Sequence, residues 1–174
     1  MDILVSADGW LRWSCQSHEQ EPVRCALGRN GLKQDKREGD GATPIGCFSL
    51  RRVLFRPDRL APPATRLPIQ PIQPADGWCD DPSDLAYNCP VLLPYSASAE
   101  SLWREDGLYD LIVILGHNDD PVLPGHGSAI FLHVARADFG PTEGCVAIGK
   151  EDLLRLLSVC KPNSRLCIRS GNRK

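Results

Sequence analysis

The sequence predicts a mostly β domain with few helices. Short apolar runs rich in β-branched and aromatic residues recur along the chain, which is typical of strands. The 15 prolines and 15 glycines among 174 residues interrupt most windows long enough for a helix. Only residues 150–160 show clear helical periodicity. We therefore expect one domain, residues 1–174, with a mixed or antiparallel, β-sandwich-like sheet, one or two short helices and a long proline-rich insertion.

The expected elements follow from local patterns. Strands are predicted at residues 3–5, 10–15, 23–28, 47–55, 108–115, 129–132, 146–148 and 166–168. The helix at 150–160 would bury one face formed by Leu153, Leu154 and Leu157. A second, shorter helix is predicted within residues 97–108.

Residues 58–105 form the long insertion. Its many prolines exclude regular structure over about twenty residues. Trp78, Tyr87 and Trp103 would anchor the segment to the rest of the domain. A long connection of this kind is either functional or a surface excursion. Two alternatives stay open: a flap over a functional site, and a segment packed against the surface.

Composition excludes some classes of function. The formal net charge is −2 and the basic residues are spread out, so nucleic acid is not an expected partner. The densest basic cluster, residues 33–37, is predicted to be a solvated loop. No stretch approaches the roughly 20 apolar residues of a membrane span, and the N-terminus lacks the apolar core of a signal peptide. We expect a cytoplasmic protein, or a periplasmic one if it is exported; composition does not set the oligomeric state.

The eight cysteines show no C-x-x-C spacing, so neither a zinc knuckle nor a dithiol redox motif is supported. Seven of them are expected to be small, buried and reduced side chains. Export would permit disulfides such as Cys79–Cys89. Cys145 is the exception because of its surroundings.

Cys145 and His133 are the candidate catalytic pair. The predicted strand at 129–132 ends at His133, and a polar loop leads from there to Gly144 and Cys145. Two strand ends joined by a loop can bring an imidazole within reach of a thiol, and a neighbouring base favours the thiolate that attacks carbonyls. Gly144 allows a tight turn and would leave amide N–H groups facing a developing oxyanion.

A zinc site is the rival interpretation. His117, His126 and His133, with Asp119 and Asp120, could in principle supply ligands. Their spacing matches no usual zinc motif, so no metal or other cofactor is expected. His117 is kept as a candidate substrate contact.

Two motifs carry a family resemblance. The first is His133 followed by Thr142-x-Gly144-Cys145, and the second is residues 40–48, DGATPIGCF. Together they resemble the signature of L,D-transpeptidase catalytic domains, the YkuD-like family, in which a His precedes Ser/Thr-x-Gly-Cys and an upstream segment reads Asp-Gly-x-Thr-Pro-x-Gly-x-Phe. The resemblance implies that family's β-rich fold.

The resemblance covers roughly residues 20–57 and 108–169 and leaves the middle unmatched. Glu143 stands where many members have a second His, and Ala147 stands where many have Arg or Asn. The loop between the histidine and the cysteine is also shorter than in many relatives.

The resemblance implies cysteine acyl transfer on a peptidoglycan stem peptide or muropeptide. Cys145 would cleave the bond between the third residue, a diamino acid, and D-alanine, with His133 as base and then acid. Water as acceptor gives an L,D-carboxypeptidase, which we favour for a cytoplasmic protein; an amine acceptor gives a 3→3 crosslink. Thr142 and Glu143 would contact substrate, and Arg136 would bind a carboxylate. A non-catalytic muropeptide-binding module is the alternative.

Overall fold

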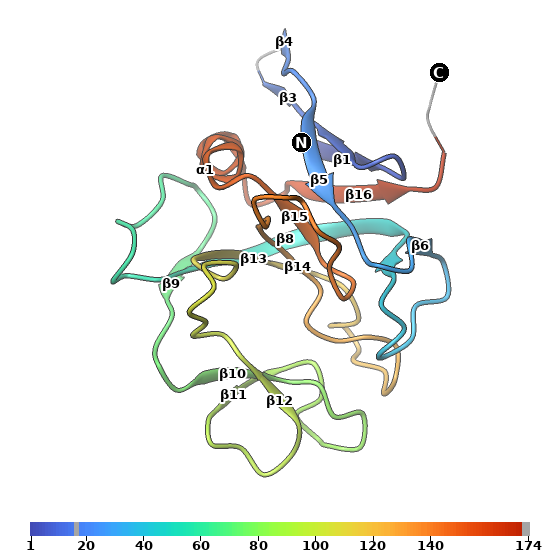
Figure 1. The fold of residues 1–174 in the computed structure, drawn as a ribbon, viewed down its shortest axis with the longest axis vertical. Helices are drawn as coiled ribbons and strands as arrows, with labels where there is room; N and C mark the ends of the chain where they lie inside the picture. Colours follow the sequence, from blue (N-terminus) through green and yellow to red (C-terminus); the bar gives the residue numbers. More distant parts are fainter. Residues whose placement is uncertain (16–17, 172–174) are drawn as a thin grey trace.

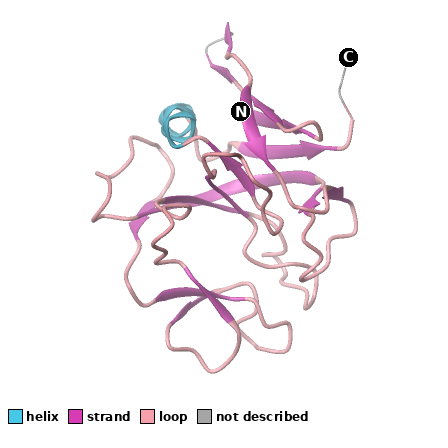
Figure 2. Ribbon diagram, viewed as in Figure 1, coloured by secondary structure: helices cyan, strands magenta, loops and turns pink. Residues whose placement is uncertain are grey.

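The computed structural model describes residues 1–15 and 18–171 (Figure 1). Its strands are β1 (Asp2–Ser6), β2 (Trp10–Arg12), β3 (Ser14–Cys15), β4 (His18–Glu19), β5 (Val23–Ala26), β6 (Leu32–Lys33), β7 (Thr43–Pro44), β8 (Gly46–Phe55), β9 (Ile69–Pro71), β10 (Asp76–Cys79), β11 (Pro90–Leu92), β12 (Ala99–Ser101), β13 (Leu111–Leu115), β14 (Phe131–Val134), β15 (Val146–Ile148) and β16 (Arg165–Arg169). One helix, α1 (Lys150–Val159), lies within the described residues, and Figure 2 shows it beside a mass of strands and loops. The prediction of a mostly β fold is confirmed.

The main sheet closes on itself. It has nine strands in the order β13-β14-β15-β5-β2-β1-β16-β8-β9, and β8 also pairs with β13. The long strand β8 makes this closure possible, because its first half pairs with β16 and its second half with β13. β9 is attached outside the ring. The sheet is mixed, since β1–β16, β14–β15 and β8–β9 are parallel pairs. The expected sandwich-like sheet is therefore a closed, barrel-like one.

The interior of the barrel is the larger apolar core. Alternate residues of each strand point inward, so Leu111, Val113 and Leu132 belong to this core. Helix α1 packs against the same core with Leu153, Leu156 and Leu157, which are fully buried. The helix was predicted correctly, but its buried face contains Leu156 in place of Leu154. In the described residues no helix is long and apolar enough to cross a membrane.

A small three-stranded sheet, hereafter the cap, lies against the outside of the barrel. Its order is β11-β10-β12, and Figure 1 shows it at the lower end of the molecule. The insertion therefore contains regular structure, and β9 lies within the stretch from which prolines were expected to exclude it. The helix predicted within residues 97–108 is wrong, because Ala99–Ser101 pairs with β10 as a strand. A second apolar core joins cap and barrel, with Trp78 and Leu102 packed against Ile112 and Phe131.

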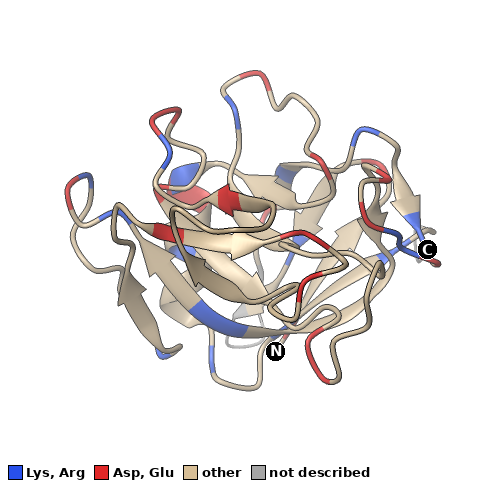
Figure 3. Cartoon of the chain, turned by 90° about the horizontal axis from the view of Figure 1, so that it is seen from below, with Lys and Arg blue, Asp and Glu red and all other residues tan. Residues whose placement is uncertain are grey.

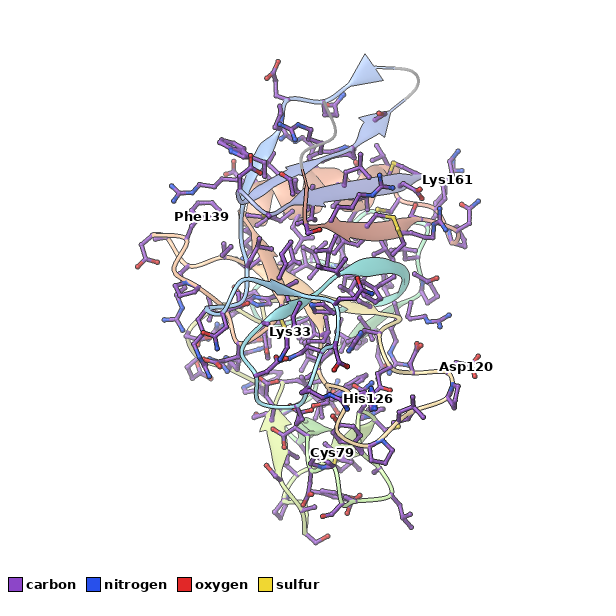
Figure 4. All side chains as sticks on the ribbon, turned by 90° about the vertical axis from the view of Figure 1, so that its right-hand side faces the viewer. Lys33, Cys79, Asp120, His126, Phe139 and Lys161 are labelled. Atoms are coloured by element: carbon purple, nitrogen blue, oxygen red, sulfur yellow. A yellow bond between two sulfur atoms is a disulfide. The ribbon has the colours of Figure 1, made fainter. Side chains whose placement is uncertain are left out.

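One disulfide joins two neighbouring strands of the barrel. Cys47 of β8 and Cys167 of β16 are register partners and form the bond, which is the yellow link in Figure 4. The expectation that both are reduced apolar side chains is wrong. Five further cysteines are free in the described chain: Cys25, Cys79, Cys89, Cys145 and Cys160. The Cys79 amide donates to the Cys89 carbonyl at 3.0 Å, but no disulfide joins the two.

Charged residues of both signs are interspersed over loops and strands. Figure 3 shows Lys and Arg mixed with Asp and Glu in this view, without a face of one sign. Several of them form ion pairs on the surface, such as Arg165 with Asp2 at 2.8 Å. Exposed pairs of this kind contribute little to stability. The charges that bear on function are those that face the cavity described next.

Candidate active site

The parallel pair β14–β15 places the two candidate catalytic side chains on one face. His133 lies opposite Ala147 in the register, and Leu132 lies opposite Val146. Because side chains alternate across a sheet, Leu132 and Val146 point into the barrel while His133 points outward. Cys145, one residue before Val146, also points outward and joins the apolar core beneath the cap. The small Ala147 leaves room beside the imidazole.

A cavity of about 350 Å³ lies between this face and the cap. It is lined by Glu38, Gly39, Asp80, Glu100, Arg104, Leu108, Tyr109, Ser128, Ala129, Ile130, His133, Arg136, Gly140, Pro141, Thr142, Glu143, Cys145 and Ala147. The lining therefore includes five of the seven site residues expected from the sequence. Gly144 lies directly behind the wall, next to Cys145, and His117 is outside the lining.

The thiol of Cys145 is neutral and held by backbone groups. Its Sγ donates to the carbonyl of Ala129 at 3.2 Å and accepts from the amide of Phe131 at 3.3 Å. The residue is 8 % exposed. Burial raises the pKa of the thiol to about 12, and the charge of Glu100 acts in the same direction. The resting site therefore holds a thiol, not a thiolate.

The imidazole of His133 is fixed in one tautomer. Its Nδ1 lies 2.9 Å from the carbonyl of Val134, which can only accept, so Nδ1 carries the hydrogen and Nε2 has the lone pair. The ring also meets Tyr109 edge-on, with centroids 5.3 Å apart. Burial lowers the pKa of His133 to about 4. His133 and Cys145 share the cavity, but no hydrogen bond joins them among the described residues.

Two threonines hold the backbone of the nucleophile. Thr142 Oγ1 donates to the Cys145 carbonyl at 2.7 Å, and Thr43 Oγ1 donates to the same oxygen at 3.3 Å. The amide of Gly144 donates to Thr142 Oγ1 at 3.1 Å, so it is engaged within the loop. Gly144 has φ +140°, and a Cβ there would lie 2.9 Å from the carbonyl oxygen of Ala42. Its role in this structure is conformational.

Of the other residues expected to contact the substrate, two line the cavity and one does not. Glu143 is mostly exposed and forms an ion pair with Arg29 at the cavity edge. Arg136 is exposed and lines the cavity without a hydrogen bond or ion pair to any described residue. His117 packs edge-on against Phe48, and its Nε2 is 3.0 Å from the carbonyl of His126. The structure does not bring His117 to the cavity.

Lys36 is a buried cation that sequence reasoning placed in a solvated loop. The residue is 6 % exposed and forms an ion pair with Asp40. The amides of Arg37 and Ala42 also donate to Asp40. These contacts offset the burial of the Asp40 carboxyl and hold its pKa at about 2. A Cβ on Gly144 would lie 3.5 Å from Lys36 Nζ, so the ammonium lies behind the turn that carries the nucleophile.

Asn88 anchors the cap to the barrel. Its Oδ1 accepts from Trp78 Nε1 at 3.0 Å and from the Ala129 amide at 3.1 Å. Its Nδ2 donates to the carbonyls of His117 and Asn118 at 3.1 and 2.8 Å. Since Ala129 in turn accepts the thiol hydrogen of the nucleophile, the insertion is tied to the reacting group. The insertion is thus packed against the barrel and also forms one wall of the cavity.

The zinc alternative has no support in the described part of the chain. No three His, Cys, Asp or Glu side chains there lie close enough to hold a metal ion. His126 and His117 meet through a backbone carbonyl, and His133 lies on the barrel face with its Nδ1 on another carbonyl. These histidines therefore have separate surroundings.

The fold and the cavity define a class of protein: a closed β barrel with a buried thiol and imidazole beneath a β cap. The chain matches YkuD, the L,D-transpeptidase catalytic domain, over residues 7–168, and it belongs to this family. The match includes the middle segment that the two motifs left uncovered. No curated protein matches the chain.

Two solved structures resemble this one in fold. Both are of the helical cell shape determining protein Pgp2 from Campylobacter jejuni, one of them a point mutant. The first is 13% identical with a TM-score of 0.53 and covers 99% of this chain and 48% of its own. The mutant is also 13% identical, has a TM-score of 0.51, and covers 99% and 47%. This chain therefore spans about half the length of those proteins, and at this identity the likeness concerns the fold.

Proposed function

We propose that this protein is a cysteine-dependent L,D-carboxypeptidase that removes D-alanine from peptidoglycan stem peptides. The proposal rests on its membership of the L,D-transpeptidase family and on one observation of geometry. The outward face of β14 and β15 turns Cys145 and His133 into the same cavity. A cavity of about 350 Å³ is within the size range of small-molecule and peptide-end sites.

The reaction would proceed in two steps. In the first, Cys145 Sγ gives its proton to His133 Nε2 and attacks the carbonyl carbon of the third-position diamino acid. The C–N bond to D-alanine breaks, the proton passes from Nε2 to the leaving nitrogen, and a thioester remains. In the second, His133 takes a proton from water, the resulting hydroxide adds, and the C–S bond breaks with return of the proton to the thiol.

Because Cys145 and His133 are both neutral at rest, binding of the substrate has to change the hydrogen bonding of the thiol. The thiol hydrogen is donated to Ala129 at rest, so it has to turn toward the Nε2 lone pair of His133 when a peptide enters. The Phe131 amide, which already donates to Sγ, would stabilise the developing thiolate. The Gly144 amide is engaged by Thr142, which leaves the amide of Cys145 as the better oxyanion donor.

Water is the proposed acceptor because the nucleophile lies deep. A water molecule reaches a thioester on a residue that is 8 % exposed more readily than the amine of a second peptide does. The alternative is a 3→3 crosslinking transpeptidase, which needs that second peptide in the cavity. We propose a cytoplasmic location with soluble muropeptides as substrates. The Cys47–Cys167 disulfide, a bond typical of oxidising compartments, favours the periplasmic alternative, and its redox state in the cell decides between the two.

Incubation with a disaccharide tetrapeptide, with and without an amine acceptor, tests the proposal. We expect free D-alanine in both cases and no crosslinked dimer. Cys145→Ser should abolish the release, whereas Cys160→Ser, which changes another buried free cysteine outside the cavity, should retain it. Dimer formation would favour the transpeptidase. Binding of the muropeptide without any release would favour the non-catalytic module and overturn the proposal.

A further inference from the structure

One carboxylate in the cavity has no partner among the residues that the structure describes. Six residues of the lining carry a full charge: Glu38, Asp80, Glu100, Arg104, Arg136 and Glu143. Four of them are paired, as Glu38 accepts from Tyr87, Glu100 from Tyr109, Glu143 pairs with Arg29, and Arg104 pairs with Asp106. Asp80 makes no side-chain hydrogen bond or ion pair with any described residue, and its Oδ1 is fully buried.

The register of the cap shows where Asp80 points. Trp78 of β10 lies opposite Glu100 of β12, and the Asp80 amide donates to the Ser98 carbonyl at 3.1 Å, which continues the pairing. Residues two apart on a strand face the same side, so Trp78, Asp80 and Glu100 share one face. Trp78 packs edge-on against Phe131 of the barrel, with centroids 5.2 Å apart. That face is therefore turned to the barrel, and both Asp80 and Glu100 line the cavity between them.

A buried, unpaired carboxylate oxygen is unfavourable in an empty site. Leaving such a group without a hydrogen-bond donor destabilises the empty site. Glu100 lies close enough for the charge of Asp80 to raise its pKa, although burial is the larger cause. A cationic ligand group at the Asp80 carboxylate would offset two neighbouring negative charges, which a neutral donor would not.

On the basis of the proposed function, we propose that Asp80, with Glu100 beside it, binds the side-chain ammonium of the substrate's diamino acid. An ammonium offers three donors and a positive charge. An amine that is already acylated, as in a crosslinked stem, has lost the charge and most of the donors. The enzyme would therefore select uncrosslinked stem peptides. Arg136, a cation of the lining with no ion pair to a described residue, would receive a carboxylate of the same substrate.

The test compares two tetrapeptides that differ only in the third residue's side-chain amine, free in one and N-acetylated in the other. For the wild-type protein we expect kcat/KM for D-alanine release to be about 10- to 100-fold higher with the free amine, the range given by one charged hydrogen bond. Asp80→Asn should remove most of this preference by raising KM for the free amine and leave the acetylated peptide unchanged. No hydrogen bond from the carboxylate to a described residue is lost, so the melting temperature should not fall.

Asp81→Asn is the matched control. This variant removes a neighbouring negative charge outside the cavity lining and keeps the side-chain oxygen that accepts the hydrogen bond of Ser83. The preference for the free amine should therefore stay as in the wild type. Equal rates for the two peptides with the wild type, or an equal loss for both in Asp80→Asn, would overturn the assignment of Asp80.

Failure of the proposed function itself gives a different result, namely no D-alanine from either peptide. In that case calorimetric binding of both peptides to the Cys145→Ala protein still decides the question. Preferential binding of the free amine, lost in Asp80→Asn/Cys145→Ala, supports the ammonium site. Equal affinities contradict it.

Discussion

Thr43 Oγ1 donates a hydrogen bond of 3.3 Å to the carbonyl of Cys145, across 102 residues of sequence. Thr43 also accepts from the amide of Gly28 at 2.8 Å, and Thr142 holds the same Cys145 carbonyl from within its own loop. The two motifs that identify the family in sequence therefore meet at one oxygen atom. Their shared task is to fix the backbone of the nucleophile.

Thr43→Val is expected to destabilise the protein by about 1–3 kcal/mol. Valine keeps the shape of the buried side chain but leaves the Gly28 amide without its acceptor. D-alanine release should fall as well, because one of the two bonds to the Cys145 carbonyl is gone. Urea unfolding measures the first effect. Thr43→Ser, which keeps the hydroxyl, should stay close to the wild type; equal stability of the Val and Ser variants would contradict this role.

The free protein should react slowly with iodoacetamide at Cys145. Only the thiolate is alkylated, and a pKa raised to about 12 by burial leaves little thiolate at neutral pH. The rate should increase about tenfold per pH unit through pH 9 and 10, where a catalytic thiolate would already have reached a plateau. Peptide mapping by mass spectrometry follows each site, with the half-buried free Cys89 as internal reference. A plateau below pH 8 would show that the resting thiol is ionised.

Mild acid should destabilise the fold through His133. Burial lowers its pKa from 6.5 to about 4, so between these values the unfolded chain binds a proton that the folded chain does not. The free energy of unfolding should therefore fall by about 3 kcal/mol as pH falls from about 6.5 to about 4. Burial also lowers the pKa of His117, which adds in the same direction.

Denaturant unfolding across this range checks the effect of His133. The pH dependence should be weaker in His133→Gln than in the wild type. A wild-type stability that is flat between pH 6.5 and 4 would mean that the imidazole is accessible to protons in the folded state.

The disulfide gives a prediction for both stability and location. It closes a loop of 120 residues, so Cys47→Ser/Cys167→Ser should lower the free energy of unfolding by about 4–5 kcal/mol under oxidising conditions. Reductant should have the same effect on the wild type and none on the double variant. Thiol labelling of cell extracts prepared in acid shows whether the bond exists in the cell; a fully reduced pair is the result expected for a cytoplasmic protein.

Local patterns predicted the elements that depend on local chemistry. The runs at 47–55 and 146–148 are strands, and the leucine-rich segment at 150–160 is the helix, because period and composition decide such cases. The motifs also placed Cys145 and His133 in one cavity. Closure of the barrel could not be predicted from local patterns, because it depends on which strand pairs with each half of β8.

Features set by distant partners were missed. Residues 99–101 have no strong strand preference of their own and become β12 because β10 lies beside them. Lys36 is buried because Asp40 neutralises it; their spacing of four residues was the available signal. No local sequence pattern indicates a functional role for Asp80, because its place in the cavity depends on the packing of the cap against Phe131.

The closed ring of strands has a consequence for how any peptide is held. β14 and β15 have neighbours on both sides, so neither offers a free edge to which an extended chain could hydrogen-bond as an added strand. Recognition of a peptide at this face then depends on side chains, which select for charge and shape. Backbone pairing, which does not depend on the peptide's sequence, contributes little. A closed barrel with no free strand edge at its reactive face therefore favours a narrow range of peptides over many different sequences.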